Sequence, residues 1–330
     1  MTRSNAPASA ALLLLASCSI VDGDEDGGEP PADPPPCDLG QCPGPDQPFA
    51  FDTIGRIGVG TRAFLRYAID PSLGDFTIVS DDPDVVAVEE VGDTIHIAGR
   101  GPGHATLHAR SADGSLDLDQ VTIRVVEVAA VQFYVRTPII EPEPVDRVAG
   151  LDGSTDSLRV LYLAANGDAL LGRSDFSASG SVQVREPEAV EGRLSEVFAP
   201  SQRVGLLFVE PGDGEVSADL GDGRSFSIPI AVVQQVPAIE VVTMVLRGDE
   251  LVASDEVSVG NPMGADVVAH RRDGTFILGV TAEWEVDPPV EYLVGPGPST
   301  EIVFTLALPG DRDVTARIGS LSATHRISTP

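Results

Sequence analysis

The chain repeats one short segment: PGDGEVSADLG at residues 211–221 returns, without a gap, as PGDRDVTARIG at residues 309–319. In both copies a turn leads into an alternating run, the pattern of a β-strand with one buried face. PGHATLHA at residues 102–109 has the same parity. The alternation predicts that the apolar residues of each run point inward: Val216, Ala218 and Leu220; Val314, Ala316 and Ile318; Ala105, Leu107 and Ala109.

A second segment also recurs, as NGDALLG at residues 166–172 and DGTFILG at residues 273–279. Repeats this far apart indicate tandem domains, each built on the same supersecondary plan. The predicted domains are residues 49–128, 129–236 and 237–330. We expect short connections between them rather than flexible linkers.

The composition favours an all-β chain. The 330 residues include 34 Gly and 27 Pro, while aromatic residues make up only 5%. Short alternating runs separated by turn clusters predict strands at residues 63–69, 94–98 and 121–125, and no segment carries a helical stripe. This pattern is typical of β-sandwiches.

Residues 76–88, FTIVSDDPDVVAV, and residues 99–107, GRGPGHATL, resemble the bacterial Ig-like domain of group 2. That family is known from bacterial surface adhesins and exported proteins. It often has Trp at the position of Ile78; the third domain keeps this aromatic as Trp284, and Phe176 is the candidate in the second. The resemblance implies a tandem of small Greek-key sandwiches without intrinsic catalysis.

The chain begins with the layout of a secretory signal: a basic residue, an apolar run at residues 10–16, and small residues at its end. LASC at residues 15–18 resembles the lipobox of bacterial lipoproteins, which implies a signal peptide at residues 1–17 and acylation of the Cys18 thiol. The alternative is an ordinary signal peptide that happens to contain a cysteine. The apolar run is too short to span a bilayer, which needs about 20 residues.

Residues 18–48 consist mainly of Asp, Glu, Pro and Gly, a composition that predicts a disordered, extended tether. Cys37 and Cys42 remain as a pair once Cys18 is acylated, and we expect a disulfide between them in an oxidising compartment. The acidic residues at 22–33 match part of a calcium-binding loop, but prolines exclude the flanking helices. A plain solvated tether is therefore favoured over a calcium site.

Several classes of catalytic site are excluded. The chain has no Lys, since all 21 basic residues are Arg, which rules out Schiff-base chemistry and the lysine of phosphate-binding loops. GVGTRA at residues 58–63 formally fits a dinucleotide fingerprint, but that motif needs a helix after it, and residues 61–69 alternate as a strand. We therefore predict a turn between strands. We predict no catalytic residue, no cofactor and no metal site.

The five histidines are scattered. His104 and His108 lie four apart on a predicted strand, about 13 Å between backbones, which is too far to share one metal ion. We interpret His108 as the equivalent of Asp219 and Arg317 in the other repeats, so that it lies on a solvated face. The same reasoning covers His96.

The net charge of −30 repels nucleic acid and anionic headgroups, so neither is an expected partner. The favoured interpretation is a lipid-anchored cell-envelope protein, in the outer membrane or at the cell surface. Its Ig-like domains would act as a non-catalytic binding, adhesion or spacer module for an unidentified protein or glycan.

Two alternatives stay open. One is a structural subunit of a larger envelope assembly. The other is an enzyme with an unrecognised site, for which the interface of the second and third domains, around Gln234, Gln235 and Pro237, is the best place. Such a site would need a deep pocket lined by carboxylates and His270 or His325.

Overall fold

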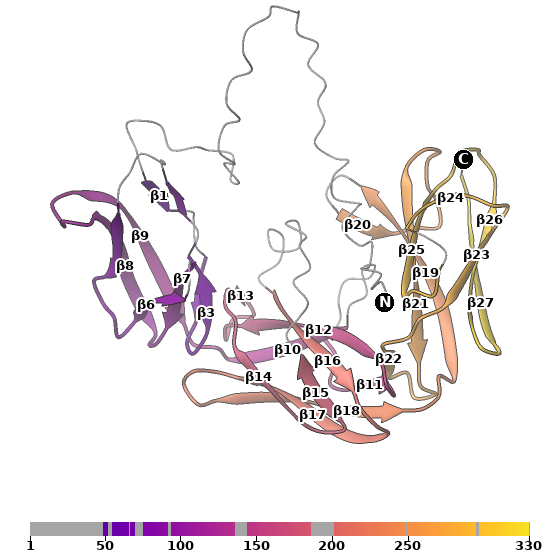
Figure 1. The fold of residues 1–330 in the computed structure, drawn as a ribbon, viewed down its shortest axis with the longest axis horizontal. Coiled ribbons are helices and arrows are strands. Elements are labelled where there is room, and N and C mark those ends of the chain that lie inside the picture. Colours follow the sequence, from indigo (N-terminus) through magenta and orange to yellow (C-terminus); the bar gives the residue numbers. More distant parts are fainter. Residues whose placement is uncertain are drawn as a thin grey trace, which may run out of the picture.

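The computed structural model describes residues 49–51, 55–65, 67–69, 75–91, 94–135, 144–185, 201–247, 250–294 and 297–329. These residues form β-strands joined by turns and irregular segments, with no helix among them. None of them therefore belongs to a helix that could cross a membrane. The strands group into sandwiches that follow one another along the chain, from indigo to yellow in Figure 1.

The first sandwich contains β1 (Phe49–Phe51), β2 (Ile57–Gly58), β3 (Arg62–Phe64), β4 (Tyr67–Ile69), β5 (Phe76–Ser80), β6 (Val86–Val91), β7 (Thr94–Gly99), β8 (Gly103–Ser111) and β9 (Asp117–Val126). One sheet has the order β2-β9-β8-β5 and the facing sheet the order β3-β7-β6. A separate ribbon pairs β1 with β4.

The second sandwich contains β10 (Ala130–Val135), β11 (Val148–Leu151), β12 (Thr155–Leu163), β13 (Ala169–Leu170), β14 (Asp175–Gly180), β15 (Val182–Arg185), β16 (Ser201–Phe208), β17 (Gly212–Asp219) and β18 (Ser225–Val233). One sheet has the order β10-β12-β16-β15, with β13 paired to β12. The facing sheet runs β14-β17-β18-β11.

The third sandwich contains β19 (Ala238–Arg247), β20 (Glu250–Ala253), β21 (Pro262–His270), β22 (Phe276–Leu278), β23 (Glu283–Asp287), β24 (Glu291–Val294), β25 (Glu301–Thr305), β26 (Arg312–Ile318) and β27 (Leu321–Ile327). Strands β19, β21, β25 and β24 pair in one sheet, and the facing sheet has the order β23-β26-β27.

The sandwiches share one topology. In each, the last two strands pair with each other in one sheet, and the two strands before them pair with each other in the facing sheet. A short early strand or bridge also pairs in parallel with the last strand or its extension. These parallel pairs are β2 with β9, β11 with β18, and Glu256 with Ser328. This is the Greek key of Ig-like domains. The described chain is all-β, a tandem of Ig-like Greek-key β-sandwiches, as the sequence predicted.

The strand register identifies equivalent residues in the sandwiches. Ile78 pairs with Ala109, Phe176 with Ala218, and Trp284 with Ala316. The three positions proposed for the family aromatic are therefore equivalent.

The same register corrects the interpretation of His108. Because Ala109, Ala218 and Ala316 are equivalent, the residues before them are too, and these are His108, Ser217 and Thr315. Asp219 and Arg317 instead correspond to Arg110. The earlier interpretation is wrong by two residues, a shift that leaves every side chain on the same face.

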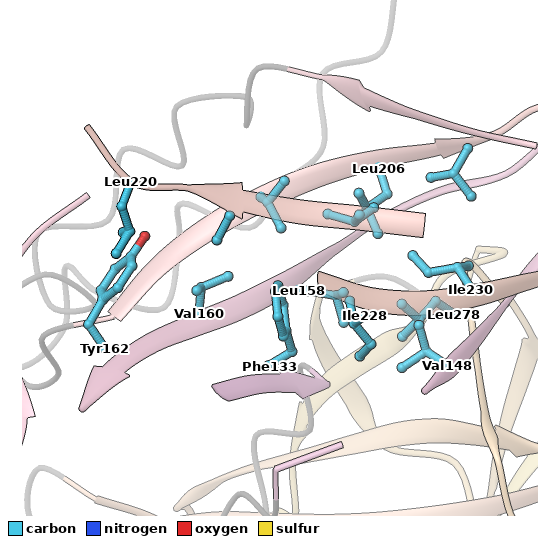
Figure 2. Close-up of a cluster of buried hydrophobic side chains, with 14 of the residues drawn as sticks. Phe133, Val148, Leu158, Val160, Tyr162, Leu206, Leu220, Ile228, Ile230 and Leu278 are labelled. Atoms are coloured by element: carbon cyan, nitrogen blue, oxygen red, sulfur yellow. The ribbon is translucent and has the colours of Figure 1, made fainter. Parts of the chain in front are cut away.

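The predicted inward residues form the core. All nine are buried except Ile318, which is half-buried. The largest fully buried side chains of the second sandwich are Tyr162 and Phe208, packed among Leu and Val from both sheets. Figure 2 shows part of this cluster, with Leu158 and Leu206 facing Ile228 between the layers. Full burial of each such side chain contributes about 1.5–3 kcal/mol.

The single strand predicted over residues 63–69 is two strands. β3 pairs with β7, whereas β4 pairs with β1. Leu65, between them, is buried, and its N–H donates to the Ile95 carbonyl at 2.9 Å. Ala63, Leu65 and Tyr67 all pack on the same core, so the alternation continues across the break and the sequence shows no boundary.

The second sandwich lies between the first and the third (Figure 1). In that view its strands run across the picture, whereas those of its neighbours run up and down. The chain thus turns at each of its two domain junctions, which makes the geometry of these junctions the main determinant of its shape.

Candidate functional sites at the domain junctions

The recurring segments NGDALLG and DGTFILG lie at the two junctions. In the first junction, Leu171 of the second sandwich pairs in parallel with Ile57 of the first. In the second junction, Leu278 of β22 pairs in parallel with Gly150 of β11. Ile57 and Gly150 each also pair in parallel with the last strand of their own sandwich. The two junctions therefore use the same edge in the same register.

Backbone hydrogen bonds join the first and second sandwiches. The Gly58 N–H donates to the Leu171 carbonyl at 3.1 Å, and the Leu171 N–H donates to the Arg56 carbonyl at 2.7 Å. Farther along, Arg62 and Arg173 exchange two backbone hydrogen bonds at 2.8 and 2.6 Å. The sandwiches are thus connected by a sheet-like ladder as well as by the chain between them.

The turn predicted within the segment of residues 58–63 is confirmed at residues 59–60, between β2 and β3, and it docks on the second sandwich. Gly60 at its centre has φ +79°, which favours glycine, and its carbonyl accepts the Gly221 N–H at 2.7 Å. A β-carbon at Gly60 would meet Leu220 and Asp222 of the second sandwich. The backbone of the turn therefore lies directly against the neighbouring domain.

Thr61 closes this turn against the recurring segment. It is fully buried, and its Oγ1 donates to the Gly58 carbonyl at 2.8 Å. A β-carbon at Gly172 would overlap Thr61 Oγ1. The second junction has the same contact, because a β-carbon at Gly279 would overlap Ser154 Oγ. Each junction thus packs a hydroxyl side chain onto a glycine of the next sandwich.

Ion pairs add to the first junction. Arg56 of the first sandwich pairs with Asp168, in the hairpin of the second. The hydrogen bond from the Asn166 amide, and next that from Arg56, hold the pKa of Asp168 below its usual value. Both groups are exposed, so this pair contributes little to stability and mainly orients the hairpin.

A more protected contact lies at the connection itself. Arg224 Nη1 donates to the Val128 carbonyl at 2.7 Å, while Nη2 lies 3.2 Å from Glu127 and 2.5 Å from Asp222. The Asp222 hydrogen bond raises the pKa of Arg224 above its usual value. This side chain therefore fixes the connection onto the second sandwich.

The buried side chains at the second junction belong to hydrophobic clusters of both the second and the third sandwich. Leu278 belongs to the buried cluster of the second sandwich, where Figure 2 shows it beside Val148 and Ile230. A smaller cluster combines Ala149 with Ala269 and other residues of the third sandwich. Because β11 pairs with β22, the sheets of the two sandwiches form one continuous sheet.

Polar contacts complete the second junction. The Gly279 N–H donates to Asp156 Oδ2 at 2.7 Å across the interface. The Thr275 N–H holds the pKa of Asp273, at the hairpin tip, below its usual value, and the positive charges of Arg271 and Arg147 act in the same direction. Arg147 belongs to the second sandwich, so this hairpin, like the first, presents an acid to a basic neighbour.

The larger hollow lies at the first junction. It has a volume of about 220 Å³ and is lined by polar residues from both sandwiches together with Phe64 and His96. His96 is half-buried with its ring 4.5 Å from the Phe64 ring, and the Arg173 guanidinium lies 4.3 Å from the same ring. The expectation of a solvated His96 is therefore wrong, because the residue packs at an interface.

A polar network lies beneath this hollow. The buried Tyr162 hydroxyl lies 2.7 Å from Gln202 Oε1 and 2.8 Å from Ser174 Oγ, and it accepts the Ser174 N–H at 3.0 Å. Burial raises the pKa of Tyr162 to about 12. The phenol is thus a neutral structural group and not a base.

The hollow between the second and third sandwiches does not match the pocket that the enzyme alternative would need. The hollow there has a volume of only about 60 Å³, and its lining contains Asp156, Asp266 and Glu301 but no histidine and none of residues 234–237. Small-molecule sites usually have volumes of about 300–1,000 Å³. Neither junction hollow reaches that size.

Both histidines considered for that pocket pair elsewhere. His270 Nε2 lies 2.9 Å from Glu240, and His325 Nε2 lies 2.8 Å from Asp255. His104 is exposed and His108 half-buried. Within the described ranges, no group of three His, Cys, Asp or Glu side chains could hold a metal ion.

The remaining predicted site residues lie outside the described residues. These are Cys18, the proposed lipid attachment point, the proposed disulfide pair Cys37 and Cys42, and the acidic residues at 22–33. The junction contacts were missed by sequence reasoning. The signal was present, since both recurring segments end in Leu-Gly, the dipeptide that pairs and packs across each junction.

No family model and no curated protein matches this chain. Several solved structures are similar to it. Domains 4–9 of the surface layer protein SbsC are 14% identical, with a TM-score of 0.37; the match covers 85% of this chain and 47% of that one. This chain thus spans about half the length of that fragment.

Two further structures cover a similar share of the chain. FdeC, an adhesin of Escherichia coli, is 12% identical with a TM-score of 0.24, over 86% of this chain and 96% of that one. Invasin, a bacterial integrin-binding protein, is 14% identical with a TM-score of 0.23, over 85% and 59%. At these identities and TM-scores, the likeness gives no information about the partners or activity of this chain.

Proposed function

We propose that this chain is a lipid-anchored cell-envelope protein whose Ig-like sandwiches form a non-catalytic module for binding, adhesion or spacing. In this proposal, residues 1–17 are a signal peptide and acylated Cys18 holds the chain to a membrane. Residues 18–48 are the tether, closed locally by a Cys37–Cys42 disulfide.

The single observation that best supports this module is that the two domain junctions are built in the same way. The same edge, register and hydroxyl-on-glycine contact join the first sandwich to the second and the second to the third. Domains joined in this way hold a fixed relative orientation, which suits presenting surfaces at a distance from a membrane. We take the units to be residues 49–128, 129–236 and 237–330.

A non-catalytic role is supported by the geometry of the described residues. Catalysis needs groups that converge in a cleft that excludes water. Here the hollows are small, and His270 and His325 are each paired with a carboxylate away from them. The partner in this proposal is a protein or glycan, and the net charge of −30 argues against nucleic acid.

The anchor is tested in cells that produce the full chain and take up an alkyne analogue of palmitate. We expect label, and retention in carbonate-washed membranes, for the unchanged chain and for the control Cys37→Ser. Cys18→Ala should lose both. Membrane retention of Cys18→Ala equal to that of the unchanged chain would contradict the anchor.

The location of the sandwiches is tested on the same cells. If the module faces outward, protease added to intact cells should remove the sandwiches while a periplasmic marker survives. Protection of the sandwiches until the outer membrane is opened would contradict a cell-surface location and would favour the alternative of an internal envelope subunit.

A further inference from the structure

The third sandwich has the edge that, in the first two sandwiches, holds the next domain. Glu256 pairs in parallel with the segment that follows β27, as β2 pairs with β9. The Asn261 N–H donates to the Ser258 carbonyl at 3.1 Å, just as the Thr61 N–H donates to the Gly58 carbonyl at 3.1 Å.

The turn at this edge also matches. Gly260 has φ +85° and donates its N–H to the Leu306 carbonyl at 2.9 Å; Gly60 has φ +79° and donates to the Gly99 carbonyl at 2.7 Å. The shared backbone gives these pairs of equivalent residues: Glu256 and Arg56, Val257 and Ile57, Val259 and Val59, Asn261 and Thr61.

Within the described chain, this edge of the third sandwich is uncovered. Val259 is 43% exposed, whereas the equivalent Val59 is 4% exposed and packs in the core of the first sandwich. Asn261 is exposed, whereas Thr61 is fully buried. Leu308, two residues beyond the acceptor of the Gly260 N–H, is 67% exposed.

In the third sandwich, a nearby side chain forms the hydrogen bond that an incoming strand forms in the first junction. In the first junction the Arg56 carbonyl accepts the Leu171 N–H at 2.7 Å. The equivalent Glu256 carbonyl instead accepts a hydrogen bond from the Ser254 hydroxyl, also at 2.7 Å. A hydroxyl can rotate to another partner, so an incoming strand N–H can replace it at small cost.

The charge at the edge is the reverse of that in the first junction. Arg56 pairs with Asp168 of the incoming hairpin, but the equivalent Glu256 is an exposed acid. The nearby basic residue Arg326 is held by Asp311 at 2.7 Å. An incoming hairpin with an acid at the Asp168 position is therefore repelled here, and one with Arg or Lys is attracted.

We propose that residues 256–261 bind a β-strand of another protein, added in parallel as Leu171 is added to Ile57. The strand carries Arg or Lys at the position of Asp168 and an apolar residue at the position of Leu171. Main-chain hydrogen bonds supply the affinity, as in other strand-addition complexes. The proposal deepens the binding role above and rests on it only in assuming a protein partner.

A second copy of this chain is a poorer occupant. Both of its recurring hairpins carry Asp near the tip, and the net charge of −30 makes two copies repel each other. Charge complementarity therefore selects a basic partner strand over self-association.

The test uses the full chain, isotopically labelled, and two cyclised hairpin peptides. Both peptides copy residues 160–173; one keeps Asp168 and the other carries Asp168→Arg. Amide chemical shifts of Val257–Gly260 are followed at low salt up to about 5 mM peptide, a range that reveals weak binding. The Glu256→Arg variant of the chain is titrated in the same way.

We expect the Asp168→Arg peptide to shift these amides with about two- to fivefold higher affinity than the Asp168 peptide, as for one exposed charge pair. The preference should reverse in Glu256→Arg. Equal affinity, shifts confined to other residues, or no shift with either peptide would overturn the proposal. So would concentration-dependent shifts of the same amides without peptide, which would assign the edge to a second copy. Membrane anchoring is measured separately, so failure here leaves the anchor test unaffected.

Discussion

Thr61 of the first sandwich packs directly onto Gly172 of the second, with no room for a β-carbon between them, and Ser154 packs onto Gly279 in the same way at the next junction. These glycines end the recurring segments, so one sequence repeat creates both interdomain contacts. Both junctions are therefore held by the same contact, a hydroxyl side chain packed on a glycine of the next sandwich.

Gly172→Ala is expected to weaken the first junction by about 2 kcal/mol more than Gly167→Ala, because only the first adds an overlap with Thr61. Gly167, with φ +85° and nothing within 4 Å of a β-carbon, serves as a glycine control that makes no interdomain contact. Urea unfolding measures the difference. In a Thr61→Gly background the extra cost of Gly172→Ala should shrink by about this amount; an undiminished difference there would contradict the contact.

Gly279→Ala and Gly274→Ala form the same pair at the second junction. Gly274 again has positive φ and open space around it, whereas Gly279 faces Ser154. We expect Gly279→Ala to be the more destabilising by a similar amount. Equal midpoints of urea unfolding for the two variants would show that the second junction does not depend on this contact.

Arg224→Met is expected to destabilise the connection between the first two sandwiches by about 1.5 kcal/mol, because it removes a charge-assisted hydrogen bond to the Val128 carbonyl. Arg326→Met is the matched control. Its ion pair with Asp311 lies on the surface, so its loss should cost less than about 0.5 kcal/mol. Chemical unfolding of both variants checks this; equal effects would count against a special role for Arg224.

Stability should fall in alkali because of Tyr162. Its pKa of about 12 in the folded chain lies above the usual value near 10, so the folded state holds the phenolic proton more tightly. This stabilisation is complete below about pH 10 and is lost as the pH rises to about 12, by about 3 kcal/mol in total. Unfolding free energies between about pH 9 and pH 12 measure the fall.

Tyr162→Phe should remove most of that fall, because no proton remains to be lost. Tyr134→Phe is the control, since Tyr134 is only half-buried and burial raises its pKa less. If the pH dependence of Tyr162→Phe equals that of the unchanged chain, another group is responsible.

Trp284 reports on the third sandwich alone. It is 6% exposed, its indole N–H donates to the Ser299 carbonyl at 3.1 Å, and it is the only Trp of the chain. We expect blue-shifted emission that iodide quenches poorly until that sandwich unfolds. Trp284→Ala should cost about 3–5 kcal/mol. Emission like that of free tryptophan in the folded chain would contradict the burial.

The core and the strand faces could be predicted from the sequence because alternation directly records which side chains are inward. Val314 and Ala316 were placed correctly for this reason, and Trp284 follows the same alternation, with Glu283 and Glu285 exposed on the other face. Alternation does not fix the register, since a shift of two residues keeps the same faces. The misplacement of His108 follows from that property.

The junctions could not be predicted because periodicity says nothing about which element covers a sheet edge. Leu171 reads as one more strand residue, and its partner Ile57 lies in another domain. His96 was misjudged for the same reason: its alternation was right, but the cover supplied by Phe64 and the second sandwich depends on how the domains are oriented.

The central claim is that the sandwiches are joined by backbone hydrogen bonds, and amide hydrogen exchange tests it most directly. The amides of Gly58, Leu171 and Gly221 donate across the first junction. We predict that they exchange at least about a hundredfold more slowly than open amides, so that their protection approaches that of the strand ladders. Exchange of these three amides at the rate of open chain, while β8 and β17 remain protected, would contradict the claim.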